Sequence, residues 1–188
     1  MQRRIIMIGG LLQFLGGCAA QAMGIMRRGE NAGYGARNVG PRELEQVKVV
    51  DASNPDREYF GQSGQPAKAY PPSLPVSSRN PGYGGNQYMS DTGHKVPEAI
   101  LISWREMPAP GAPSYTGTLI GPFKISVRSK VPPEVLAQAQ KDRISLNFGF
   151  TSGLVPPYMV WQLEERIVTK PIPGQPSVPF KVLAEGKG

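Results

Sequence analysis

The sequence predicts a mainly β protein, an antiparallel sheet or sandwich of about six to eight strands with one short helix, and leaves an α+β fold as the alternative. Three observations predict this class. Apolar and polar residues alternate with a period of two in several segments of the second half, as in half-buried strands. Glycine and proline are abundant, with 23 and 20 residues, and favour many turns. Finally, a single segment has helical spacing.

The expected strands follow the alternation, and each places its apolar residues on one inward face. Trp104 and Trp161 fall on such faces, so we expect both to be largely buried. Pro179 lacks an amide hydrogen and demotes the last strand to a sheet edge. The alternation predicts strands at residues 47–50, 99–105, 123–128, 144–148, 158–163 and 178–183, with shorter ones near 57–60 and 87–89.

Residues 132–142 break the alternation. Val135, Leu136 and Ala139 lie at helical spacing, and proline is tolerated in the first turn of a helix. Glu134 near the start favours the helix dipole. We expect a helix of about two to three turns that packs these three apolar side chains on the sheet.

The beginning of the chain resembles a lipoprotein signal. Arg3 and Arg4 precede an apolar stretch at residues 5–15. This stretch is too short to cross a bilayer, because a spanning helix needs about 20 apolar residues. Leu15-Gly16-Gly17-Cys18 then resembles the bacterial lipobox, which implies a lipid on the Cys18 sulfur and cleavage before Cys18. The alternative is cleavage after Ala22, at an A-x-A site that would release a soluble chain.

These features predict three parts: a signal peptide at residues 1–17, a lipidated tether at 18–42 and a single β-rich periplasmic domain at 43–188. Several acyl chains give stable anchoring where one is marginal. Residue 19 is Ala, not the Asp that resembles an inner-membrane retention signal. We therefore expect the outer membrane, periplasmic face, with a soluble periplasmic protein as the alternative.

The net charge is +7, and the positive residues are scattered. A lipidated envelope protein does not normally meet nucleic acid, so we expect none as a partner. The charge instead favours anionic lipid headgroups, an acidic protein partner or an ordinary solvated surface. With one cysteine no disulfide can form within the chain, so the apolar core must hold the fold.

No constellation of residues predicts catalysis or metal binding. His94 is the one histidine, and Ser63 lies in G-Q-S-G-Q, which is not the G-x-S-x-G of hydrolases. Glu164 and Glu165 are adjacent on an expected strand, so they point to opposite faces and cannot share one glycosidic bond. One histidine and one lipidated cysteine do not make a typical zinc site. We expect no enzymatic activity and no cofactor.

Residues 54–97 are crowded with Pro, Gly, Ser and Asn, and a structureless loop of that length would be unusual. Within it, residues 79–91 combine flexible glycines with tyrosine and arginine, which are favoured at binding hot spots. A turn-rich hairpin with inward tyrosines is the alternative. The candidate partner-binding residues are Arg79, Tyr83, Tyr88 and Met89.

Residues 96–106 (VPEAILISWRE), Tyr115, the expected helix near Pro133 and residues 153–163 (GLVPPYMVWQL) carry a resemblance. A Pro before a strand ending in Trp, then a G-L-x-P turn before a second Trp strand, resembles small proteobacterial outer-membrane lipoproteins. Some of these are immunity proteins encoded beside lipase effectors of type VI secretion systems. The turn here reads Val155-Pro156-Pro157, without the glycines of that pattern.

The resemblance implies a non-enzymatic lipoprotein whose partner is a lipase-type toxin, neutralised in the periplasm by binding. The alternative function is structural: a lipoprotein that tethers an envelope-spanning secretion or pilus assembly. No binding residue follows from the resemblance.

Overall fold

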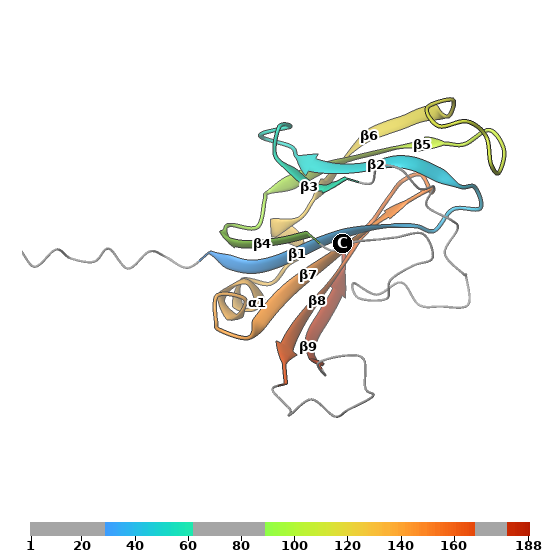
Figure 1. The fold of residues 1–188 in the computed structure, drawn as a ribbon. Helices are drawn as coiled ribbons and strands as arrows, with labels where there is room; N and C mark the ends of the chain where they lie inside the picture. Colours follow the sequence, from blue (N-terminus) through green and yellow to red (C-terminus); the bar gives the residue numbers. More distant parts are fainter. Residues whose placement is uncertain (1–28, 62–88, 168–179) are drawn as a thin grey trace, which may run out of the picture.

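The computed structural model describes residues 29–61, 89–167 and 180–188, which form a sandwich of two β-sheets (Figure 1). The mainly β class with one short helix is confirmed. The described residues contain nine strands, one more than the upper expectation. The five-stranded sheet has the order β4-β1-β7-β8-β9, and the four-stranded sheet has the order β3-β2-β5-β6.

Neighbouring strands run antiparallel, except that β1 and β7 are parallel. The helical elements lie between β6 and β7 in the chain and are a 3₁₀ turn at Arg128–Lys130 and the helix α1 at Pro133–Gln138. The strands are β1 (Glu30–Asn38), β2 (Leu44–Asp51), β3 (Glu58–Gly61), β4 (Met89–His94), β5 (Ala99–Glu106), β6 (Thr118–Ser126), β7 (Ile144–Ser152), β8 (Met159–Arg166) and β9 (Phe180–Lys187).

The core lies between the two sheets, and the predicted inward faces form it. Ile100, Ile102 and Trp104 on β5 are fully buried. Trp161 on β8 is also buried, as expected. The helix α1 has six residues and is shorter than the two to three turns expected. Its Val135 and Leu136, and Ala139 directly after it, belong to the apolar cluster as predicted. The period of two therefore located the core correctly.

The expected tether at residues 18–42 is wrong in its second half, because residues 30–38 form the buried strand β1. It pairs with β4 along one edge and with β7 along the other, and every residue of the strand except Asn31 is buried, so both of its faces are covered. Ala32, Tyr34 and Ala36 face the core, while Gly33 and Gly35 alternate with them. With glycine in place of polar residues, no alternation marks the strand.

The last strand is an edge, as its sequence predicted. β9 pairs with β8 alone among the described strands, and Phe180, Val182 and Leu183 are all exposed. Among the described residues, no helix is long and apolar enough to pass through a bilayer.

Candidate functional site

A cleft of about 420 Å³ opens at the end of the sandwich where β1 begins. Three segments converge there: the turn between β2 and β3, the loop between β4 and β5, and the end of the strand β6 (Figure 1). The polar and charged side chains that line the cleft are Asp51, Ser53, Arg57, His94, Lys95, Glu98 and Lys124.

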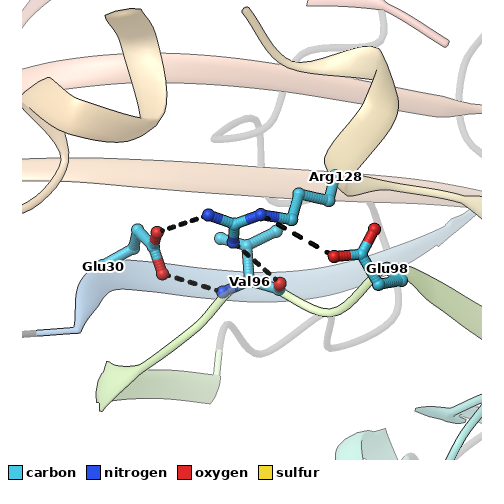
Figure 2. Close-up of polar contacts among 4 residues, drawn as sticks. All are labelled: Glu30, Val96, Glu98 and Arg128. Atoms are coloured by element: carbon cyan, nitrogen blue, oxygen red, sulfur yellow. Dashed lines mark hydrogen bonds and ion pairs between the residues drawn. The ribbon is translucent and has the colours of Figure 1, made fainter. Parts of the chain in front are cut away.

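Arg128 fixes the loop that forms one wall of this cleft (Figure 2). Its Nη2 lies 3.0 Å from Oε1 of Glu30, and its Nη1 donates to the Val96 carbonyl at 3.1 Å. The second Glu30 oxygen accepts from the Val96 amide at 3.0 Å. Arg128 Nε lies 3.8 Å from Glu98. One guanidinium thus ties the first residue of β1 to the β4–β5 loop.

Asp51 organises the opposite wall. Its Oδ1 accepts hydrogen bonds from the Ser53 amide at 2.8 Å and from the Ser53 hydroxyl at 2.6 Å, and its Oδ2 accepts from the Tyr59 hydroxyl at 3.0 Å. Burial raises the pKa of Asp51, but these hydrogen bonds outweigh it and hold the pKa below its ordinary value. The ionised carboxylate thereby pins the start of the turn between β2 and β3.

The cleft brings Asp51, Ser53 and His94 together, the residue types of a serine hydrolase. In such an enzyme the serine hydroxyl donates its proton to the histidine, and the carboxylate orients that histidine. Here the Ser53 hydroxyl is directed at Asp51 instead, and Tyr59 occupies the other oxygen. These hydrogen bonds stabilise the local turn. They do not pair the Ser53 hydroxyl with His94 as a nucleophile and its base.

Three cations, Arg57, Lys95 and Lys124, and a second carboxylate, Glu98, line the rest of the cleft. The Arg57 guanidinium lies 5.2 Å from the centre of the Tyr59 ring, a cation–π distance. Lys95 and Lys124 are exposed, and neither side chain makes an ion pair within the described part of the chain. The cleft is therefore suited to an anionic group.

The adjacent acids on β8 behave as predicted. Glu164 is buried and accepts a hydrogen bond from the Asn147 amide at 2.8 Å, whereas Glu165 is exposed. They lie on opposite faces and cannot act as a pair. In residues 29–61, 89–167 and 180–188 no group of three or more His, Cys, Asp or Glu side chains could hold a metal ion.

Most of the predicted site residues, Cys18, Arg79, Tyr83 and Tyr88, lie outside the residues that the structure describes. Met89 begins β4 and pairs with Tyr34 of β1. The cleft was not predicted, because its residues come from segments far apart in the sequence. The one local signal was Asp51-Ala52-Ser53 directly after a strand, a spacing typical of an Asx turn.

No family model matches the chain, and no significant match is found among curated proteins or among solved structures.

Acid should destabilise the protein through Glu30 and Asp51. Burial raises the pKa of Glu30, but hydrogen bonds from Arg128 and the Val96 amide lower it below the ordinary 4.5. Asp51 is likewise lowered from 3.8. When the pKa of a carboxyl is lower in the folded protein than in the unfolded chain, the carboxyl stabilises the fold. This stabilisation is complete above the pKa of the unfolded chain and is lost as the pH falls through the pKa of the folded protein. We expect the free energy of unfolding to decline from about pH 4.5 downward.

Urea denaturation between pH 7 and pH 3 measures this decline. Asp51→Asn should make it shallower, since one contributing carboxyl is gone. Glu134→Gln, at an exposed position on α1, should keep the wild-type slope. A wild-type stability that does not change down to pH 3 would contradict the assignment.

Proposed function

We propose that the protein is a non-enzymatic lipoprotein, anchored through Cys18 at the periplasmic face of the outer membrane, that acts by binding another protein. The observation that carries the binding role is the edge strand β9, on which Phe180, Val182 and Leu183 are exposed apolar residues, together with Ile167 just after β8 (the β9 patch). Their side chains are 38, 48, 36 and 38 % exposed. Apolar side chains left exposed along a sheet edge are typical of interaction sites.

Both edges of the other sheet are better protected. β3 has four residues, and β6 carries Pro122 and Lys124, which discourage the addition of another strand. β9 has eight residues and three exposed apolar side chains. An extended segment of a partner can add to such an edge through main-chain hydrogen bonds and place apolar side chains on the patch. Charged neighbours such as Glu165 and Arg166 would form its polar rim.

The partner we propose is an antibacterial secretion-system effector of the lipase type, which would make this chain an immunity protein. Two things support this choice: the resemblance at residues 96–106 and 153–163, and the lipobox, which would put the inhibitor where such a toxin acts. Inhibition would work by occupying the toxin surface. The cleft side chain His94 is therefore not needed for it.

The β9 patch is tested with Val182→Lys, which places a charge in the middle of the exposed edge. Loss of one hot-spot contact costs about 2 kcal/mol or more, so the dissociation constant for the effector should rise about 30-fold. Protection of cells against the effector should fall with it. Leu119→Lys is the matched control, because Leu119 is an exposed apolar residue on the edge strand of the other sheet. It should bind like wild type.

Three other outcomes would redirect the proposal. Weaker binding in a triple variant, Arg79→Ala with Tyr83→Ala and Tyr88→Ala, and unchanged binding in Val182→Lys would move the partner to residues 79–91. Loss of protection in His94→Ala with the fold intact would favour an enzyme. Co-purification of a secretion channel, with no effector neutralised, would favour the structural role.

A further inference from the structure

The cationic cleft and the start of the first strand, β1, lie at the same end of the sandwich. Glu30, the first residue of β1, accepts a hydrogen bond from the amide of Val96, which lines the cleft. Glu30 lies twelve positions after Cys18 in the sequence. An extended chain spans at most about 3.3–3.6 Å per residue, so a lipid on Cys18 would hold this end within about 40 Å of the bilayer.

The charges at this end are of the sign that a phospholipid surface attracts. Arg57, Lys95 and Lys124 all line the cleft, and both lysines are exposed. Two carboxylates, Asp51 and Glu98, also line the cleft, but within the described residues neither forms an ion pair with Lys95 or Lys124. Asp51 accepts hydrogen bonds from Ser53 and Tyr59, and Glu98 lies beside Arg128. The exposed lysines therefore keep their charge available to an external anion.

We propose that this end of the sandwich faces the membrane, and that Lys95, Lys124 and Arg57 contact the phosphates of anionic lipid headgroups. The inference rests on the proposed anchoring through Cys18. A short tether alone allows the domain to rotate freely above the bilayer. Basic residues act within about a Debye length of an anionic surface, roughly 8–10 Å, so their contact would select one orientation. An acidic surface of a partner protein is the alternative occupant of the cationic cleft.

The test uses the exported Cys18→Ser chain, in which headgroup contact can be measured without the lipid. It should float with vesicles of phosphatidylglycerol and phosphatidylcholine, and not with phosphatidylcholine alone. Each basic residue near an anionic surface contributes about five-fold in binding, so Lys95→Gln with Lys124→Gln should lower partitioning about 25-fold. Added salt should weaken wild-type binding in the same way.

The matched control is Arg42→Gln with Lys187→Gln, which removes the same two charges elsewhere. Arg42 precedes the start of β2, whereas the other end of that strand lines the cleft. Lys187 pairs with Val160 across the sheet, and through β7 this row of residues reaches Gly35 of β1. Gly35 is five residues along β1 from Glu30, so Lys187 lies away from the cleft end of the sheet. The control should partition almost like the wild-type sequence. An equal loss in both pairs would show that net charge alone drives binding and would overturn the inference.

Two results separate this inference from the proposed function. Palmitate labelling of Cys18 in the wild-type chain, with no preference for anionic vesicles, would overturn the headgroup contact and leave the anchor standing. Selective vesicle binding without any label would support the contact and reject the anchor. If the lysine pair loses a protein partner but binds vesicles normally, the cleft belongs to an acidic protein and the inference fails.

Discussion

Trp104→Ala should lower the free energy of unfolding by about 3–5 kcal/mol, the cost typical of removing a buried aromatic side chain. Trp104 is completely buried on β5, and its ring stacks on Phe123 of β6 with 5.4 Å between centroids. The alanine variant would leave a cavity between the two sheets. Trp104→Phe should cost much less: it keeps most of the apolar contact and removes the indole N–H, which has no hydrogen-bond partner in the structure.

Urea or thermal denaturation of the exported chain measures these differences. Ser126→Ala is the control, because Ser126 is exposed on the strand that pairs with β5. Its effect should stay within about half a kcal/mol. A larger loss for Ser126→Ala than for Trp104→Ala would mean that the inward face of this sheet is assigned wrongly.

The second large effect is expected at the Glu30–Arg128 pair. Glu30 is almost completely buried, and its contact with Arg128 measures 3.0 Å. Arg128→Ala would leave the Glu30 carboxylate buried without its guanidinium. Breaking a buried pair from one side typically costs about 3–5 kcal/mol. Arg128→Lys should recover only part of this, because an ammonium lacks the planar fork that reaches Glu30 and the Val96 carbonyl together.

A double-mutant cycle isolates the interaction. Glu30→Gln with Arg128→Ala should cost less than the sum of the two single changes, since the double variant retains no uncompensated charge. Glu98→Ala is the control: its side chain is 85 % exposed and lies 3.8 Å from the same guanidinium. Exposed pairs contribute about 0–1 kcal/mol, so this change should be nearly neutral. Strict additivity in the cycle would show that Glu30 and Arg128 do not interact.

The parts of the fold that the sequence predicted share one property. β5 and β8 each bury one face, so Ile100, Ile102 and Trp104 alternate with partly exposed residues and reveal the strand. β1 is covered on both faces and carries glycines where polar residues would otherwise stand, so the same criterion failed there. The length of the tether was overestimated for the same reason, because a stretch without alternation resembles a tether.

The cleft could not be predicted for a different reason. Asp51 and His94 are separated by more than forty positions and lie on strands of different sheets, so only the packing of the two sheets brings them to one cleft. Nothing in the local sequence around His94 indicates which carboxylate it will lie near. The local Asx turn at Asp51 was the part of the site accessible to sequence reasoning, and it is structural.

The parallel pairing of β1 with β7 bears on when the chain can fold. The Ser152 hydroxyl donates to the Arg37 carbonyl across 115 residues, and β1 also requires β4 as its other neighbour. If the chain is exported as proposed, β1 leaves the export channel first and must wait for partners that leave much later. Contacts this distant in sequence close slowly. During that delay the N-terminal segment stays accessible to processing enzymes, so acylation of a cysteine ahead of β1 would precede the closure of the sheet.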